Sequence, residues 1–278
     1  MPIGILNNIP SLVAENNLSI TSQNLQKTLF RLSSGSRINS GADDAAGLAI
    51  ADGLHANTTA LTQSAQNANS GVGALQVADG ALAQVTTLLN RAVTLATEAS
   101  TGTVSQAQRG ALDAEFTQIK AEIDRIGSTT TFNGTSVFTA TTSIFLSDAS
   151  STSQIGVTVG TVASGAITDG TGANAVNISA DTLTGTAAQT ALTHIDSAIA
   201  NIASIRGNIG AGINRLQSAV NVINNQVQNL TSAEDGIRAA DIPSEVANLS
   251  RYTILNQSGI SALAQANSAQ QSILTLLR

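Results

Sequence analysis

Residues 192–230, LTHIDSAIANIASIRGNIGAGINRLQSAVNVINNQVQNL, carry the pattern that decides the fold. Large apolar residues recur there in alternating steps of three and four, and only Arg206 interrupts the series: Leu192, Ile195, Ile199, Ile202, Ile209, Ile213, Leu216, Val220, Ile223, Val227 and Leu230. This repeat places one narrow apolar stripe along a helix roughly 60 Å long. A stripe of that width is buried by another helix that runs beside it.

Two upstream segments carry matching stripes. The first repeats every seventh residue and the second in steps of four and three: Leu61, Ala68, Leu75, Leu82, Leu89 and Ala96, then Leu112, Phe116, Ile119, Ile123 and Ile126. Three long helices are therefore predicted, over about residues 44–100, 105–127 and 190–231. Their predicted core comprises Leu112, Phe116, Ile119, Ile123, Ile199, Ile202, Ile209, Ile213, Leu216 and Val220.

The two ends of the chain carry a thinner version of the pattern. It comprises Leu18, Leu25, Leu29 and Leu32 near the start, and Val246, Leu249, Thr253, Asn256, Ile260, Leu263, Asn267, Gln270, Leu274 and Leu277 near the end. Polar residues inside such a series set register at a cost in stability. The ends are predicted to be helices that pair with each other. The expected fold class is mainly α, a long antiparallel bundle or coiled coil formed by the N- and C-terminal halves.

The middle of the chain has a different character. Residues 127–191 contain no Lys or Arg, and small polar residues alternate with Val and Ile, as in QIGVTVGTV. Asn133-Gly134 is a hairpin turn signal. A small β-hairpin region is therefore predicted within a turn-rich segment over about 132–188. A disordered Ser/Thr-rich linker is the alternative.

Composition argues against most kinds of functional site. The net charge of -6 gives no reason to expect nucleic acid, and the absence of cysteine removes thiolate chemistry. The two histidines, His55 and His194, lack HExxH spacing, so neither metal nor cofactor is expected. No uninterrupted apolar run reaches about 18 residues, and the first residues lack a signal-peptide pattern, so membrane insertion is not expected.

Asp43 and Asp44 are the one adjacent acid pair that invites a catalytic interpretation. They precede the apolar run AAGLAIA, where acidic residues cap the amides of a helix N-terminus. Capping, with Arg31 and Arg37 as candidate ion partners, is the favoured interpretation. Catalysis is not expected, and the chain is interpreted as a protein that is not an enzyme.

Three segments resemble the signatures of bacterial flagellins. They are LFRLSSGSRINSGADDAAGLAIADGL at 29–54, AEIDRIGSTTTFNGTSVF at 121–138, and SEVANLSRYTILNQSGISALAQANSAQQSILTLLR at 244–278. The resemblance covers roughly residues 1–138 and 188–278. Flagellins insert variable outer domains in the middle, and only about fifty residues stand there in this chain. The resemblance therefore implies a minimal flagellin with little or no outer domain.

The family architecture assigns the parts of the chain to two concentric tubes of a hollow filament. Residues 1–43 and 236–278 correspond to the inner tube, and residues 44–235 to the outer tube. The inner-tube packing residues implied are Leu18, Leu25, Leu29, Leu32, Val246, Leu249, Ile260, Leu263, Leu274 and Leu277. The resemblance also implies a secreted, extracellular filament that serves as the propeller for swimming. Its implied partners are further copies of the chain, a flagellin chaperone, the flagellar type III export apparatus, the filament cap and hook-associated proteins.

One surface patch matches the family in part. Arg91, Leu95 and Glu115 occupy positions that correspond to the patch by which many flagellins engage the flagellin-sensing Toll-like receptor. The family motif has a second arginine two residues after the first, where this chain has Val93. These three residues are the candidate innate-receptor contact.

Other functions remain as alternatives at this point. A hook-filament junction protein has similar helical termini, although its C-terminal signature resembles LAQAN and LLR less closely. Some flagellins carry an inserted protease domain with HExxH, for which the short middle has no place. A monomeric coiled-coil adhesin would explain the stripes but not the terminal motifs.

Overall fold

The computed structural model describes residues 8–139, 141–146, 154–168 and 175–276, with side chains as far as residue 271. The described part contains five helices and two two-stranded antiparallel sheets, which confirms the expected mainly α class with a small β region. It divides into two compact units. Unit 1 comprises Met1–Ala56 with Asn229–Arg278, and unit 2 comprises Asn57–Gln228.

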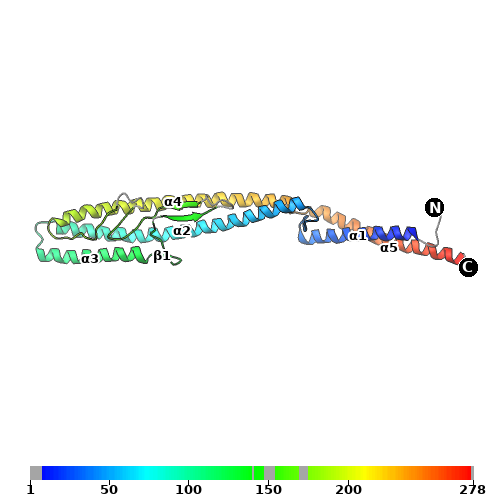
Figure 1. The fold of residues 1–278 in the computed structure, drawn as a ribbon, viewed down its shortest axis with the longest axis horizontal. Coiled ribbons are helices and arrows are strands. Elements are labelled where there is room, and N and C mark those ends of the chain that lie inside the picture. Colours follow the sequence, from blue (N-terminus) through cyan, green and yellow to red (C-terminus); the bar gives the residue numbers. More distant parts are fainter. Residues whose placement is uncertain (1–7, 140, 147–153, 169–174, 277–278) are drawn as a thin grey trace. The chain divides into compact units, whose positions relative to one another are not determined.

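Unit 1 is built on two helices, α1 (Ile9–Ser34) and α5 (Ile242–Leu276), which lie side by side (Figure 1). They run antiparallel, because Asn8 bonds the carbonyl of Ala266 while Arg31 bonds Glu245. The side chain of Asn8 also accepts from the Ser11 amide and caps α1, and Gly35 ends it in the left-handed conformation at φ 68°. The predicted pairing of the two ends is therefore present.

Unit 1 also holds the ends of the two longest helices. Asp52 and His55 of α2 (Ala45–Ala99) contact Arg238 and Glu234 of α4 (Ala187–Arg238) at 3.5 and 3.4 Å. These contacts join the two helix ends to each other within unit 1. The compact division falls inside α2 and α4, at residues 56 and 229, which is 13 residues after the boundary at 43 and seven residues before the boundary at 236 expected from the sequence.

Unit 2 contains the rest of α2 and α4 together with α3 (Gln106–Thr129), and the three run beside one another (Figure 1). Arg91 of α2 pairs with Glu115 of α3 at 2.7 Å, and Asp79 of α2 pairs with Arg206 of α4 at 2.7 Å. Ser105 and Gln108 form a capping box that fixes the start of α3. All three helices begin and end within a few residues of the predicted limits, apart from the C-terminal end of α4.

The core of unit 2 alternates large and small side chains. All six residues of the seven-residue repeat on α2 are buried, as are Phe116, Ile119 and Ile123 of α3. On α4 the buried residues are Ala188, Ala191, Ile195, Ala198, Ile202, Ile205, Ile209, Gly212, Leu216 and Ile223. Of the predicted core, Leu112, Ile199, Ile213 and Val220 are only half-buried.

About half of the large residues in the predicted α4 stripe therefore lie at the edge of the buried face. The centre of that face includes small residues such as Ala198 and Gly212, which a search for large apolar side chains does not find. Gly212 shows why a small residue is needed at the centre of this face. A Cβ built there would lie 2.7 Å from Cγ1 of Val157, so the strand that ends at Val157 packs directly on the helix backbone.

The middle segment forms two hairpins. β1 (Thr131–Phe132) pairs with β2 (Thr135–Ser136), and β3 (Thr142–Phe145) pairs with β4 (Gln154–Val157). Asn133 and Gly134 between β1 and β2 have φ values of 49° and 77°. Two successive positive values are the signature of a type I′ turn, as the Asn-Gly signal predicts.

The irregular segment that follows is held to α3 and α4 by side chains from those helices. Asp124 accepts from both the amide and the hydroxyl of Ser164, at 2.6 and 2.7 Å, and Asp113 accepts from the Leu183 amide at 2.8 Å. Lys120 donates to the carbonyls of Ser179 and Asp181. Apolar side chains under the segment are buried: Val157, Val159, Val162, Ile167, Ile178 and Leu183. The described residues of 154–186 are thus not a linker.

One helix, α2, is long and apolar enough by composition to cross a membrane, with a window of mean hydropathy 1.2. Its apolar residues at seven-residue spacing are buried against protein, and Asp79 within it pairs with Arg206. A core helix passes the same test of length and composition, so this feature carries no argument for a membrane span.

Glycines on α3 provide a matched test of the loop packing. A Cβ at Gly127 would collide with the backbone carbonyl of Val162, whereas a Cβ at Gly110 would meet nothing within 4 Å. We expect Gly127→Ala to destabilise unit 2 by about 2 kcal/mol or more, because a backbone segment must shift. Gly110→Ala should stabilise it by about 0.5–1 kcal/mol. Urea unfolding followed by circular dichroism measures both; equal effects would show that the loop does not pack on Gly127.

Candidate functional site

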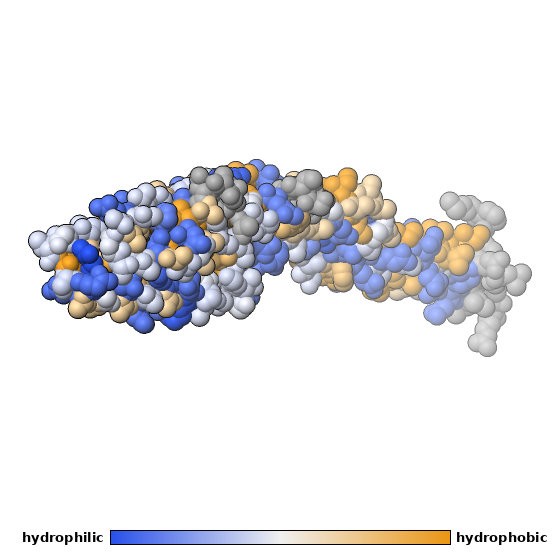
Figure 2. Space-filling model, turned by 60° about the vertical axis from the view of Figure 1, so that its left-hand side comes forward, coloured by the Kyte–Doolittle hydropathy of each residue, from blue (hydrophilic) through white to orange (hydrophobic). Residues whose placement is uncertain are grey.

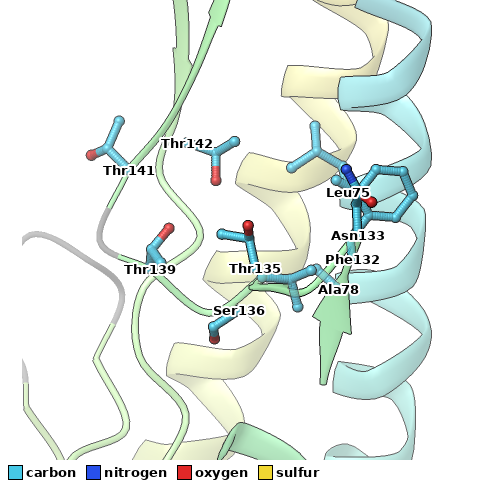
Figure 3. Close-up of a pocket in the computed structure, with 11 residues that line it drawn as sticks. Leu75, Ala78, Phe132, Asn133, Thr135, Ser136, Thr139, Thr141 and Thr142 are labelled. Carbon is cyan, nitrogen blue, oxygen red and sulfur yellow. The ribbon is translucent and has the colours of Figure 1, made fainter. Parts of the chain in front are cut away.

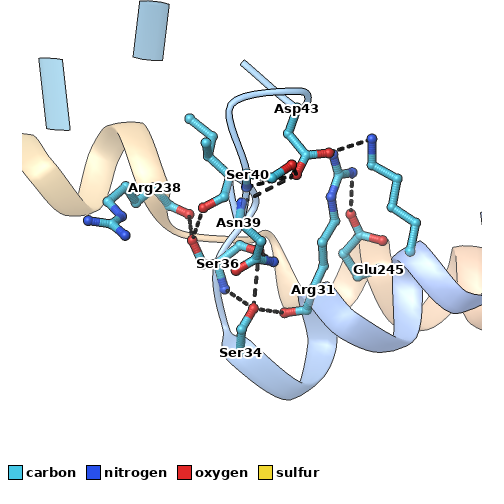
Figure 4. Close-up of polar contacts among 10 residues, drawn as sticks. Arg31, Ser34, Ser36, Asn39, Ser40, Asp43, Arg238 and Glu245 are labelled. Carbon is cyan, nitrogen blue, oxygen red and sulfur yellow. Dashed lines mark hydrogen bonds and ion pairs between the residues drawn. The ribbon is translucent and has the colours of Figure 1, made fainter. Parts of the chain in front are cut away.

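A polar junction connects the helices of unit 1 (Figure 4). The Arg37 amide donates to the Arg238 carbonyl at 2.7 Å, and the Ala240 amide donates to the Gly35 carbonyl at 2.9 Å. The Ser36 hydroxyl lies within hydrogen-bond distance of the Ile38 and Arg238 carbonyls, at 2.9 and 3.1 Å. The connection after α1 and the connection before α5 therefore hold each other in place.

Asp43 organises the charged side of this junction. Its carboxylate contacts Lys27 at 2.5 Å and Arg31 at 3.8 Å, and it accepts from the amides of Asn39 and Ser40. The pKa of Asp43 is lowered to about 2, chiefly by the hydrogen bond from Lys27 and also by the hydrogen bonds from Asn39 and Ser40. The predicted capping role therefore applies to the loop that precedes α2.

Asp44, Arg31 and Arg37, which the sequence also assigned to this region, make separate contacts around Asp43. Asp44 caps α2, since it accepts from the Gly47 amide at 2.9 Å. Arg31 also pairs with Glu245 of α5 at 3.2 Å, and Glu245 is only 9% exposed. Arg37, proposed from the sequence as an ion partner, instead donates to the Ile237 carbonyl.

The second functional feature of unit 1 is its apolar surface. Its large exposed apolar side chains are Ile9, Leu12, Val13, Ile20, Leu29, Phe30, Ile50, Ile242, Val246, Ile254, Leu255 and Ile260. Phe30 is 63% exposed, and apolar patches are visible on the surface in Figure 2. Among the described residues of unit 1, only Ile38 and Ala51 are buried apolar residues. Such a surface marks a protein-protein contact.

The predicted inner-tube residues belong to this surface only in part. Leu18, Leu25, Leu32, Leu249 and Leu263 are half-buried between α1 and α5, whereas Leu29, Val246 and Ile260 are exposed in the single chain. The side chains of Leu274 and Leu277 lie outside the described residues. One predicted polar layer is also visible, because Asn267 accepts a hydrogen bond from the Ser11 hydroxyl at 3.0 Å.

The candidate receptor patch is assembled only in part. Arg91 meets Glu115 through two bonds, Nε to Oε1 at 2.7 Å and an Nη to Oε2 at 3.1 Å. Each partner shifts the pKa of the other, upward for Arg91 and downward for Glu115. Leu95, in contrast, is 1% exposed. Its assignment as a surface contact is corrected, because position 95 turns into the three-helix core while position 91 stays outside.

A groove of about 360 Å³ lies in unit 2 between α2 and the β1–β2 hairpin (Figure 3). Its lining residues are Ala74, Leu75, Ala78, Phe132, Asn133, Thr135, Ser136, Val137, Thr139, Thr141 and Thr142. None of these residues is charged. Within the described part of the chain, no three His, Cys, Asp or Glu residues gather as metal ligands. The groove therefore offers no acid-base chemistry.

Comparison with known proteins identifies the family. Residues 5–143 match the bacterial flagellin N-terminal helical region, and residues 192–277 match the bacterial flagellin C-terminal helical region. The chain belongs to the bacterial flagellin family. It is 36% identical over 278 residues to the flagellin of Halalkalibacterium halodurans, covering 99% of both chains. It is 34% identical over 288 residues to the flagellar filament 33 kDa core protein of Treponema phagedenis, again covering 99% of both.

A solved structure is also similar to this flagellin. The crystal structure of Bacillus cereus flagellin shares 29% identity, with a TM-score of 0.47 over 61% of this chain and 94% of that one. The match to relatives of nearly the same length supports a flagellin with little outer domain. Membership makes the chain a subunit of the flagellar filament, and a hook-filament junction protein is not favoured.

The pKa of Asp43 predicts how acid acts on the junction. A carboxyl whose pKa is depressed in the fold stabilises it above the ordinary value of 3.8, and this contribution is lost as pH falls toward about 2. In an NMR titration of the full chain we expect Lys27→Met to raise the pKa of Asp43, while Arg215→Met, on an exposed arginine of unit 2, leaves it unchanged. An unaltered Asp43 titration in Lys27→Met would contradict the assigned cause.

Proposed function

We propose that residues 1–43 and 236–278 form the inner tube of the filament, and that residues 44–235 form the outer tube. The antiparallel pair of α1 and α5, here called the α1–α5 hairpin although the two helices are distant in sequence, lies within the inner-tube residues. The observation that carries this proposal is the unequal burial of the two units. Unit 2 has a continuous core, whereas unit 1 exposes most of its large apolar side chains. A hairpin of this kind is completed by neighbouring copies of itself.

The energetics support assembly through unit 1. Fully burying a large aliphatic or aromatic side chain contributes about 1.5–3 kcal/mol. Burial of even half of the dozen exposed side chains of unit 1 is then worth on the order of 10 kcal/mol per subunit. Association costs of about 4–15 kcal/mol oppose this gain. Many contacts per subunit are therefore needed, as in a helical polymer.

The wider role follows from family membership. We infer that the protein is purely structural, that it is secreted to the extracellular filament by the flagellar type III export apparatus, and that the filament acts as the propeller. A flagellin chaperone, the filament cap and hook-associated proteins are its proposed partners. The uncharged groove and the uncovered hairpin support a packing role in preference to a catalytic one.

Deletion of residues 244–278 tests the proposal. We expect the truncated protein to lose seeded polymerisation completely, because the deletion removes α5, while unit 2 keeps its thermal transition. Ile254→Ser with Leu255→Ser should weaken polymerisation, and Val77→Ser, on an exposed valine of unit 2, serves as the control. Electron microscopy and sedimentation give the result. Normal filaments from the truncated chain would rule out the inner-tube assignment.

We also propose that Arg91 and Glu115 contact the flagellin-sensing Toll-like receptor. The ion pair presents both side chains on the surface of unit 2. Val93 provides no second guanidinium, and buried Leu95 adds nothing, so the patch is smaller than the full family motif. Binding should then be weaker than that of flagellins that carry the complete motif.

A titration of the monomer against the receptor ectodomain measures this affinity. We expect Arg91→Ala to weaken binding about tenfold, because a charged contact is commonly worth about 1–3 kcal/mol. Arg125→Ala, which removes an equally exposed arginine paired with Glu122, should leave binding unchanged. Affinity equal to that of a full-motif flagellin, or no loss in Arg91→Ala, would exclude the patch.

A further inference from the structure

The α1–α5 hairpin has few charged groups, and most of them are engaged at the junction. Lys27, Arg31 and Glu245 all take part in its ion pairs. Along the described remainder of the two helices, the charged residues are Glu15 on α1 and Arg251 on α5. Both are exposed, and neither has an ion-pair partner among the described residues.

Arg251 lies on the edge of the hairpin that carries an apolar groove. This groove, about 550 Å³, runs between the helices and includes Val13 and Asn17 of α1 and Leu255 and Ser258 of α5. Arg251 stands one helical turn before Leu255, so the two side chains share a face. The charge therefore sits at the end of the groove.

Glu15 lies on the opposite edge. It is two residues from both Val13 and Asn17, and two residues correspond to a rotation of about 200° around the helix, so Glu15 faces away from the groove. One turn earlier stands Ser11, whose hydroxyl bonds Asn267 across the hairpin. Leu12, Val13, Asn16 and Ser19 line the surface hollow that contains Glu15, so Val13 borders both this hollow and the groove. The hairpin thus carries one acid on one edge and one base on the other.

Edges of opposite charge suit head-to-tail contacts. In such an assembly the two sides of each subunit meet different surfaces, and repetition closes a ring or continues as a helix. Leu12 beside Glu15 and Leu255 beside Arg251 are exposed, so association would remove water from both charges. A charge left without a partner there would be costly, which favours the arrangement that joins them.

We propose that Glu15 of one subunit pairs with Arg251 of the adjacent subunit and thereby sets the register of their hairpins. This inference rests on the proposed inner-tube role. The antiparallel register places Arg251 beside positions 25–27 of α1, because Ser11 meets Asn267 and Arg31 meets Glu245. These positions are about ten to twelve residues from Glu15, so adjacent hairpins are staggered by roughly 15–18 Å along their axes.

Charge reversal of each partner tests the pair. We expect Glu15→Arg and Arg251→Glu to raise the critical concentration for seeded polymerisation about three- to tenfold each, through like-charge contact. The double variant should return to within about twofold of the original protein. The deficit of each single variant should shrink between 50 and 500 mM NaCl, because salt screens the repulsion.

Two controls reproduce the same changes of net charge outside the hairpin. Asp196→Arg and Arg215→Glu alter exposed residues of α4 that have no ion-pair partner among the described residues. They should polymerise like the original protein. Circular dichroism of each monomer, compared with the original protein, verifies that unit 2 is folded.

The outcomes separate the pair from the broader proposal. Failure of the unaltered protein to polymerise would remove the inner-tube role itself. Normal polymerisation of both single variants, equal losses in the controls, or no rescue in the double variant would overturn the Glu15–Arg251 pair and leave that role standing. Rescue, together with the two side chains within 4 Å across subunits in a cryo-EM map of the filament, supports it.

Discussion

The number of helices that share an apolar stripe decides what each part of this chain can do alone. In unit 2 three helices and an anchored loop surround the stripe, and residues such as Phe116, Ile123 and Ile209 are buried completely. In unit 1, α1 and α5 pack against each other as a pair, so each of these two helices turns one side to its partner and the rest to the surroundings. The same apolar pattern therefore gives a stable core in one unit and an adhesive surface in the other.

The helices and their limits were largely predictable because their signals are local. Apolar periodicity, the Ser105 cap and the Asn133-Gly134 turn each act over a few residues. Burial was less predictable, since it depends on the partner. Gly212 is central on α4 because Val157 packs on it, whereas Ile213 beside it is only half-buried. A stripe identified by side-chain size misses such close approaches.

The polar contacts of the site were predictable in kind more than in detail. Acidic residues before α2 suggested capping, and Asp44 does cap that helix, but the loop geometry that brings Lys27 and the Asn39 amide to Asp43 has no short-range signal. The meeting of Arg91 and Glu115 followed from antiparallel helices. The burial of Leu95 did not, because a shift of about 40° around α2 separates exposed position 91 from the core. Sequence spacing alone does not resolve that angle.

Scarcity of charge makes each charged residue on unit 1 informative. Only 11% of the residues are charged, and three of the five charged residues on α1 and α5 form ion pairs at the junction. Apolar contacts between smooth helices tolerate sliding, because a shift by one turn exchanges one aliphatic side chain for another. A single ion pair contributes little to total affinity when it is exposed. Its energy nevertheless depends steeply on position, and a polymer repeats it at every contact, so a weak pair can select one register among many of nearly equal apolar burial.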